Sequence, residues 1–147
     1  MRIREAGQTD LDAWAALRHA LWPECAEATA REEAEAILRS ADEICFLLVD
    51  GAGRAAGFVE GAVHVGPEGP YAHVEGWYVD PDRRGQGHGQ ELIGRLEQWC
   101  LHRAIYRLTS DTTKDYPSSP EAHARAGFRI IHRFTIFLKE LRPDAEV

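Results

Sequence analysis

The sequence predicts a mixed α/β fold, in which a predominantly antiparallel central sheet is flanked by helices. Segments with apolar residues at helical spacing alternate with short runs of β-branched and aromatic residues, in the order β-α-α-β-β-β-α-β-α-β. The three consecutive strands in the middle are separated by short turns, which indicates an antiparallel meander. The later strands are separated by helical segments and therefore need crossover connections.

The first third of the chain predicts one strand and two helices. Residues 2–5 form the first strand, and residues 9–12 (Thr-Asp-Leu-Asp) read as a capping box at the start of a helix. Pro23 ends that helix, because proline cannot continue the backbone hydrogen bonds. Residues 29–40, rich in Ala and Glu, form the second helix. The apolar residues at helical spacing before Pro23 are Leu11, Trp14, Leu17 and Leu21.

The middle of the chain predicts three strands. Residues 44–49 are a continuous apolar run, typical of a strand buried on both faces. Residues 50–53 (Asp-Gly-Ala-Gly) form a hairpin turn into a strand at residues 55–65. Residues 71–80 form a further strand.

The last part of the chain predicts two helices and two strands. Residues 87–102 form the third helix, with an apolar face that includes Leu92. A strand at residues 105–110 and a short helix at residues 121–126 follow. Residues 128–138 are rich in β-branched and aromatic residues and are expected to form the closing strand.

Length and composition indicate one globular domain over residues 1–147, with 44% hydrophobic and 28% charged residues. No apolar run approaches the roughly 20 residues of a membrane helix, and the N-terminus lacks a signal peptide, so we expect a cytoplasmic protein. Cys25, Cys45 and Cys100 are far apart and odd in number, which argues against a disulfide framework or a metal site. The net charge of −7 argues against a nucleic-acid partner and is compatible with a cationic one.

The most informative segment runs from Val79 to Gly89, where an extended apolar run meets a Pro-containing turn, two arginines and three alternating glycines. Helical spacing begins directly afterwards. Glycine lets the backbone turn its N–H groups inward, and a helix N-terminus adds partial positive charge at the same point. This combination suits a pyrophosphate. The alternative is a glycine-rich surface turn before an ordinary helix.

The spacing decides which pyrophosphate carrier fits this segment. No Lys-Ser or Lys-Thr pair follows the glycines, which excludes a P-loop, and Gln90 takes the place of the third glycine of a Rossmann fingerprint. The residues Arg84-Gly85-Gln86-Gly87-His88-Gly89 read R-x-x-G-x-G. That pattern resembles the acetyl-coenzyme A loop of the GNAT superfamily of N-acetyltransferases, whose fold has the same order of elements.

Further motifs resemble one branch of that superfamily, the aminoglycoside 6′-N-acetyltransferases. The resemblance covers residues 2–141, and its motifs occur in the same order with similar spacing. The family's L-R-x-x-L-W, L-E-G-x-Y-V, S-D, serine and H-x-x-x-G-F motifs match Leu17-Arg18-His19-Ala20-Leu21-Trp22, Val74-Glu75-Gly76-Trp77-Tyr78-Val79, Ser110-Asp111, Ser119 and His123-Ala124-Arg125-Ala126-Gly127-Phe128.

Two segments depart from the family pattern. The family's R-x-x-Y-V-x-G segment before L-E-G is missing, and the shorter residues 65–70 stand in its place. This difference concerns the choice of substrate. Tyr116 takes the place of an asparagine expected five residues after the S-D aspartate, which concerns one contact to pantetheine.

The resemblance implies acetyl-coenzyme A as the co-substrate, with no metal. The backbone of Trp77, Tyr78 and Val79 would pair with pantetheine as an added strand would, and the Val79 amide would polarise the thioester carbonyl. One such oxyanion donor contributes about 10²–10³ in rate. The other positions implied to contact the coenzyme are Arg84, Gly85, Gln86, Gly87, His88, Gly89, Ser119 and His123.

Two carboxylates are candidates for binding the amine and accepting its proton. Glu75 lies in an otherwise apolar strand, where an acid is costly unless it is paired or faces a cleft. Asp111 follows a predicted strand and is the second candidate. The residues alone also allow a paired surface carboxylate at Glu75 and a turn-capping aspartate at Asp111. Trp22 is a candidate wall for a sugar ring, with core packing as its alternative.

His123 lies four residues before Gly127, where many members of the superfamily have a tyrosine that acts as general acid for the departing thiolate. It is a candidate proton donor or coenzyme contact, and packing is its alternative. A thiolate can also leave without an acid, because thiols are far more acidic than alcohols. Cys100 lies within the apolar helix pattern and is a poor candidate for an acyl-enzyme nucleophile.

Together these observations predict an acetyl-coenzyme A-dependent enzyme that acetylates a primary amine of a cationic small molecule by direct attack in a ternary complex. The resemblance implies an aminoglycoside, its 6′-amine, antibiotic resistance and a homodimer, with residues 134–138 at the dimer interface. Two alternatives remain at this point: an acetyltransferase for a polyamine or a protein N-terminus, and a non-enzymatic acyl-coenzyme A sensor. No membrane partner is expected.

Overall fold

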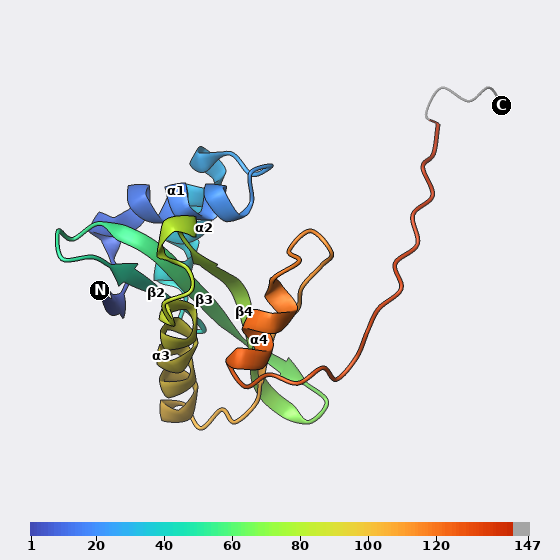
Figure 1. Ribbon diagram of the computed structural model, residues 1–147. Coiled ribbons are helices and arrows are strands. Elements are labelled where there is room, and N and C mark those ends of the chain that lie inside the picture. Colours follow the sequence, from blue (N-terminus) through green and yellow to red (C-terminus); the bar gives the residue numbers. More distant parts are fainter. Residues whose placement is uncertain (143–147) are drawn as a thin grey trace.

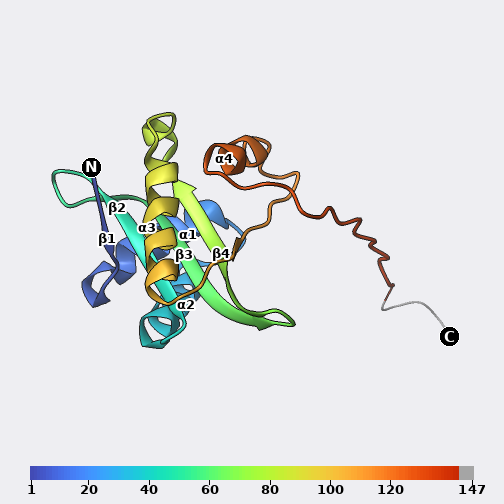
Figure 2. The same cartoon turned by 90° about the horizontal axis from the view of Figure 1, so that it is seen from below.

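The computed structural model describes residues 1–142, and it confirms the predicted mixed α/β fold. A five-stranded sheet in the order β1-β2-β3-β4-β5 has α1 and α2 on one face and α3 on the other (Figures 1 and 2). All neighbouring strands are antiparallel except β4 and β5, which are parallel. The strands are β1 (Arg2–Glu5), β2 (Glu43–Val49), β3 (Ala55–Gly66), β4 (Gly69–Val79) and β5 (Leu108–Thr109), and the α-helices are α1 (Leu11–Leu21), α2 (Glu27–Arg39), α3 (His88–His102) and α4 (Ser119–Arg125).

The sheet is buried on both faces because helices cover both. Alternate residues of β2 therefore enter different cores: Phe46 packs on the α3 side and Leu47 on the α1 side. Gly61 marks the tightest contact with α3, since an added Cβ would lie 2.5 Å from the Leu96 side chain. The sheet thus forms a rigid layer between two separate apolar clusters.

A β-bulge interrupts the pairing of β3 with β4. Gly61 pairs with Val74 and Glu60 pairs with Gly76, so Glu75 is the extra residue on β4. The bulge shifts the alternation of side chains by one position. Val74 packs on the α3 side before the bulge, and Trp77 packs on that same side after it.

The predicted capping box at residues 9–12 is wrong. A single 3-10 turn, η1 (Gln8–Asp10), precedes α1, and no side-chain hydrogen bond caps that helix. The Asp10 carboxylate instead accepts the N–H of Gly7 at 2.8 Å and pairs with the Arg4 guanidinium at 2.8 Å. Arg4 on β1 binds the carboxylate that was predicted to cap the helix, and this ion pair connects the start of α1 to β1.

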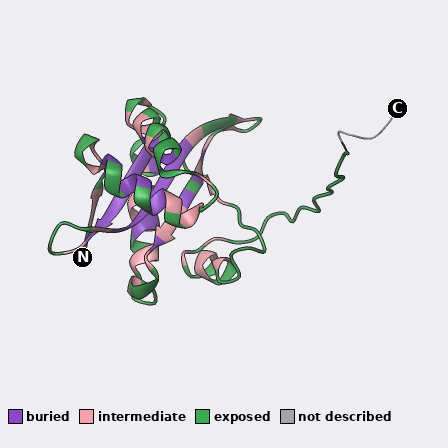
Figure 3. Cartoon of the chain, turned by 90° about the horizontal axis from the view of Figure 1, so that it is seen from above, coloured by how far each residue is buried: buried purple, intermediate pink, exposed green. Residues whose placement is uncertain are grey.

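The predicted closing strand at residues 128–138 is also wrong. Residues 129–142 form no helix or strand and run away from the sheet, with their side chains exposed (Figures 1 and 3). The predicted strand at residues 105–110 is reduced to β5, whose one strand neighbour among the described residues is β4. Strand propensity is not enough here, because a strand also needs a neighbour to complete its backbone hydrogen bonds.

Candidate functional site

The edge of β4 that faces β5 is open over most of its length. The two strands pair only at Ala72 with Leu108 and at His73 with Thr109, so from Val74 onward this edge has no strand neighbour within residues 1–142. An unpaired strand edge presents free N–H and C=O groups to an extended ligand.

The hydrogen-bond alternation of an antiparallel pair determines which backbone groups face this open edge. Asp80 donates its N–H to the carbonyl of Ala56 on the β3 side, so the neighbouring Val79 directs its N–H and C=O to the other side. Trp77 has the same orientation as Val79, whereas Tyr78 faces β3. Of the three residues predicted to pair with pantetheine, Trp77 and Val79 therefore have their backbone groups at the open edge.

The glycine-rich loop joins the end of β4 to α3 through the turn η2 (Pro81–Arg83). Gly85 has φ of 79° and Gly87 has φ of 84°, a left-handed conformation that favours glycine. Gly87 is the last residue before α3, so the first amides of that helix lie directly behind the loop. The backbone of this loop therefore has the conformation expected of an anion-binding site.

Some side chains of the loop make contacts within the loop or to the end of β4. The Nε of Arg84 donates to the carbonyl of Val79 at 2.7 Å, and its guanidinium lies 5.4 Å from the centre of the Tyr78 ring. His88 and Gln86 lie within hydrogen-bonding distance of each other, at 3.2 Å. Arg84 thus fastens the loop to the end of β4 through Nε, which leaves its two terminal nitrogens for a ligand.

His123 on α4 joins several of the predicted coenzyme residues. Its ring packs edge-on against Trp77, with the ring centres 5.2 Å apart. Its Nδ1 donates to the backbone carbonyl of Ser119 at 2.8 Å, and its Nε2 lies 2.7 Å from Ser110 Oγ. Since a carbonyl oxygen can only accept, Nδ1 carries the proton, and in the neutral ring Nε2 accepts the hydroxyl proton of Ser110. Sequence reasoning had quoted Ser110 within a motif but had assigned it no role.

Glu75 and Asp111, the two predicted catalytic carboxylates, belong to one group of side chains. Glu75 projects from the bulge and pairs with His64 Nε2 at 2.7 Å, while Asp111 lies 3.5 Å from His73 Nε2. The rings of His64 and His73 meet edge to face, with centres 6.2 Å apart. The two histidines therefore connect the two carboxylates, and sequence reasoning missed both. Their contact depends on the register of the β3–β4 hairpin, which the sequence does not specify.

Trp22 lies at the end of α1 against the bulge. A Cβ added to Gly76 would lie 2.7 Å from the Trp22 ring, so only a glycine lets the indole approach β4 this closely. The ring also meets Phe58 edge-on, with centres 6.2 Å apart. Trp22 is only half-buried, and the residue that it contacts on β4, Gly76, follows Glu75 directly in the sequence.

A buried ion pair supports Trp22 from beneath. Arg18 donates to the Glu60 carboxylate at 2.6 Å, and Trp14 Nε1 donates to the same carboxylate at 2.8 Å. Burial raises the pKa of Glu60, and the neighbouring Arg18 opposes that rise. The Arg18 guanidinium lies 4.9 Å from the centre of the Trp22 ring. Arg18, although part of a predicted motif, therefore has a structural task, and Glu60 is not a surface charge.

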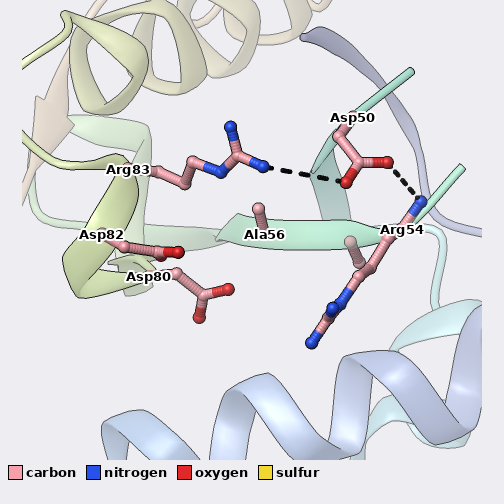
Figure 4. Close-up of a pocket in the computed structure, with 7 residues that line it drawn as sticks. Asp50, Arg54, Ala56, Asp80, Asp82 and Arg83 are labelled. Atoms are coloured by element: carbon pink, nitrogen blue, oxygen red, sulfur yellow. Dashed lines mark hydrogen bonds and ion pairs between the residues drawn. The ribbon is translucent and has the colours of Figure 1, made fainter. Parts of the chain in front are cut away.

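A small cleft lies between the β2–β3 turn and η2 (Figure 4). Asp50 accepts the N–H of Arg54 at 2.9 Å and lies 3.9 Å from Arg83. Asp80 and Asp82 complete the charged lining. Its carboxylates make this cleft unsuited to a phosphate, and it is separate from the group around Glu75.

Several other classes of site find no support in the part of the chain that the structure describes. Cys100 is 4% exposed, and burial raises the pKa of its thiol, which agrees with its exclusion as a nucleophile. Within residues 1–142 no group of three or more His, Cys, Asp or Glu side chains is arranged to hold a metal ion. None of the described helices is long and apolar enough to cross a membrane.

Comparison with known proteins identifies relatives over nearly the whole chain. Residues 11–128 match the family model of the acetyltransferase (GNAT) family. The chain is 32% identical to an aminoglycoside N(6′)-acetyltransferase type 1 of Stenotrophomonas maltophilia, over 97% of this chain and 95% of that protein. It is 33% identical to the enzyme of the same name from Klebsiella aerogenes, over 95% of this chain and 96% of that protein.

Solved structures agree with these relatives. The aminoglycoside 6′-N-acetyltransferase AAC(6′)-Ig of Acinetobacter haemolyticus superposes with a TM-score of 0.85 at 25% identity, covering 97% of this chain and 100% of that one. AAC(6′)-Iy in complex with the bisubstrate analogue CoA-S-monomethyl-acetylneamine superposes with a TM-score of 0.85 at 26% identity, covering 95% and 98%. With its open β4 edge, its glycine-rich loop and these relatives, the chain belongs to the GNAT family of acetyltransferases.

Proposed function

We propose that this protein is an acetyl-coenzyme A-dependent N-acetyltransferase that acetylates the 6′-amine of an aminoglycoside and thereby confers resistance. The observation that carries this proposal is that β4 has two separate features, an open edge and a bulge that carries a carboxylate. The open edge of β4 suits an extended acyl carrier. The bulge on the same strand directs Glu75 to the face of the sheet that carries His64 and α1. The names of the relatives identify the substrate class, and the chain's net charge of −7 suits a polycation.

The coenzyme occupies the α3 side of this arrangement. Pantetheine pairs with the outward backbone groups of Trp77 and Val79, and the pyrophosphate lies over the amides of residues 85–89, assisted by the free nitrogens of Arg84. In this position the Val79 N–H stabilises the oxyanion of the tetrahedral intermediate. The expected contribution is about 10²–10³ in rate for one such donor.

The amine occupies the α1 side. Glu75 and Asp111 bind the ammonium groups of the substrate, and Trp22 forms a flat apolar wall for a sugar ring. The neutral amine then attacks the acetyl carbon directly, and the C–S bond breaks to release the coenzyme thiolate. Holding both substrates in one site supplies much of the acceleration, since effective molarities reach roughly 10⁵ M or more.

Ser110 and His123 receive the thiolate. Their side chains are 2.7 Å apart and lie next to Trp77, on the coenzyme side of the sheet. A protonated His123 donates to Ser110 Oγ, which frees the serine hydroxyl proton for the sulfur. An acid at this point is helpful rather than essential, because a thiol is already a good leaving group.

A cytoplasmic location suits an enzyme that consumes acetyl-coenzyme A.

The protein acts as a homodimer joined through its C-terminal arm, residues 129–142. Seven large apolar side chains of this arm are at least 65% exposed in the single chain: Ile130, Ile131, Phe134, Ile136, Phe137, Leu138 and Leu141. Such a run calls for a partner. A second copy is the partner that fits, because β5 lacks a second neighbour among the described residues and the arm has strand propensity.

Light scattering during size-exclusion chromatography tests the dimer. The wild type is expected to elute with twice the chain mass, and Ile136→Asp is expected to give a monomer. Leu101→Asp is the matched control, since Leu101 is 59% exposed on α3, away from the arm. A wild-type protein that elutes as a monomer contradicts the proposal.

The activity itself is tested by release of free thiol from acetyl-coenzyme A with kanamycin, spermidine and a peptide as separate acceptors. Turnover with kanamycin alone, and an acetyl group on its 6′-nitrogen by NMR, are the expected results. Turnover with spermidine or the peptide alone would replace the substrate. Tight coenzyme binding with no turnover would make the protein an acyl-coenzyme A sensor.

A further inference from the structure

Resting on the proposed function, we infer that His73 is the base that accepts the proton of the attacking amine and that Asp111 stabilises the resulting imidazolium. His73 is the last residue of β4 that pairs with β5, so it stands where the two strands separate. Its side chain lies on the same face of the sheet as Glu75 and His64, which is the side proposed for the amine.

Thr109 determines which nitrogen of His73 is free. The Thr109 hydroxyl donates to the carbonyl of Ala72 at 3.3 Å, and the same oxygen lies 2.7 Å from His73 Nδ1. With the hydroxyl proton directed at Ala72, we assign Nδ1 as the donor to the threonine oxygen. In the neutral ring Nε2 therefore has a lone pair and no proton.

That lone pair points toward a carboxylate instead of a donor. Asp111 Oδ2 is 3.5 Å from Nε2, too far for a strong hydrogen bond and close enough for a strong charge interaction once Nε2 is protonated. Two acceptors side by side favour a cation between or near them. An ammonium group of the substrate, or the proton that it gives up, is such a cation.

The strand end separates this base from the thiol side of the reaction. Thr109 is the last residue of β5, and Ser110 follows it directly. Thr109 contacts His73, and Ser110 contacts His123. The acetyl thioester passing between β4 and the residues after β5 would thus have an imidazole on each side.

An imidazole suits this proton transfer better than either carboxylate. An ordinary carboxyl group titrates near pH 4 and an imidazole near pH 6.5, which is closer to the working pH of a base. Glu75 is moreover already paired with His64. The titratable groups around His73 are Asp111 after β5, His64 on β3, and Glu75 and Tyr71 on β4, the latter two through His64.

The proton balance of the reaction is then complete. The bound ammonium loses one proton to become the nucleophile, and the amine loses a second as the new C–N bond forms and the C–S bond breaks. One of these protons passes through His73 Nε2 to solvent, and the thiolate leaves as a thiol with the equivalent of the other. The products are the amide, free coenzyme A and one proton.

The pH dependence of kcat/KM for kanamycin tests the assignment. In the wild type log kcat/KM is expected to fall by one for each pH unit below the titration of the base. In His73→Gln kcat is expected to drop about 100-fold at pH 8 and that falling limb to disappear, with KM for acetyl-coenzyme A unchanged. His102→Gln, an exposed histidine at the end of α3, is the matched control and should behave as wild type.

Thr109 provides a second variant that leaves the base in place. Thr109→Val keeps the shape of the side chain but frees the tautomer, so kcat is expected to fall several-fold, and Thr109→Ser is expected to restore it. Full activity of His73→Gln, with the falling limb retained, would overturn the assignment, and full activity of Thr109→Val would remove the role of Thr109 in fixing the tautomer.

Histidine ¹⁵N–¹H spectra of the wild type decide the matter even where a variant fails to fold. A proton on Nδ1 of His73, and loss of its lone pair on acidification, are expected, whereas the Nε2–H tautomer contradicts the assignment. The two proposals fail differently. No thiol release by the wild type with kanamycin removes the proposed function, and normal turnover by His73→Gln removes only the base.

Discussion

The side of β4 proposed for the coenzyme (the coenzyme side) and the side proposed for the amine (the amine side) are built in different ways. Most of the coenzyme side comes from one contiguous segment, the end of β4, the loop at residues 84–89 and the start of α3. The amine side is assembled from Trp22 on α1, His64 on β3, Glu75 and His73 on β4, and Asp111 beyond β5. A contiguous segment can be recognised from its spacing, whereas an assembled face depends on strand register.

This difference predicts that the two sides can be disabled separately, and the largest effect is expected on the amine side. Glu75→Gln removes the charge proposed to bind the ammonium and is expected to lower kcat/KM for kanamycin about 100-fold, because a buried or positioned charge partner contributes up to a few kcal/mol. KM for acetyl-coenzyme A should not change. Steady-state kinetics with each substrate varied in turn measures both.

Glu32→Gln, on the exposed side of α2, is the control for this loss of one negative charge. If Glu32→Gln has the same effect as Glu75→Gln, the net charge of the protein binds the substrate and the bulge carboxylate has no special role.

The same separation is expected at Asp111, with a smaller effect. Asp111→Asn is expected to lower kcat at least tenfold, because the imidazolium of His73 loses its counter-charge. The affinity of the free enzyme for coenzyme A, measured by isothermal titration calorimetry, should remain that of the wild type. An equal loss of coenzyme affinity would place Asp111 on the coenzyme side and would remove the distinction between the two sides.

The glycine loop is expected to give a tenfold effect confined to the coenzyme. Gly87→Val forces a side chain into a backbone with φ of 84°, which costs about 1–2 kcal/mol and corresponds to roughly a tenfold rise in KM for acetyl-coenzyme A. Gly94→Val on α3 is a suitable control, since nothing lies within 4 Å of its added Cβ. A raised KM for kanamycin alone would contradict the predicted role of the loop.

Arg84→Ala is expected to have a smaller effect of the same kind. Its terminal nitrogens contribute to phosphate binding and its Nε holds the loop to Val79 at 2.7 Å, so KM for acetyl-coenzyme A should rise about fivefold, or ~1 kcal/mol. Arg39→Ala, on the exposed end of α2, serves as the comparison. An unchanged KM in Arg84→Ala would assign the pyrophosphate to the backbone amides alone.

The smallest effect is expected outside both sides, at the Arg4–Asp10 pair. The hydrogen bond from Arg4 lowers the pKa of Asp10, so the pair stabilises the fold above the ordinary titration of an aspartate. That stabilisation, about 0.5–1 kcal/mol after solvent screening, is lost as the pH falls through the lowered pKa. Urea unfolding of wild type and Asp10→Asn should therefore differ at pH 7, begin to converge as the pH falls below about 4, and coincide only below the lowered pKa of Asp10. A change in either KM would show that the pair reaches the site.

The same contrast explains how much could be predicted from the sequence. The strand predicted at residues 71–80 is Gly69–Val79, and the helix predicted at residues 87–102 is His88–His102. Periodicity and turn chemistry act locally, so they are visible in the sequence. Glu75 was identified as an acid in an otherwise apolar strand, and Asp111 as a carboxylate directly after a predicted strand. Their catalytic roles remain predictions.

The parts that could not be predicted depend on partners distant in the chain. His64 meets Glu75 only because the bulge fixes the register of the hairpin, and a shift of one residue would place these side chains on opposite faces. The prediction of a strand at residues 128–138 was wrong for a related reason. These residues have the propensity, but their own chain offers no neighbouring strand in the described part.

The bulge at Glu75 also has a consequence for engineering new specificity. Beyond it, β3 and β4 continue for several residues to a tight tip where Gly66 faces Gly69. Because the bulge fixes the register of His64, His73 and Glu75, residues 65–70 at the tip can be exchanged in pairs of residues while these three side chains keep their face of the sheet.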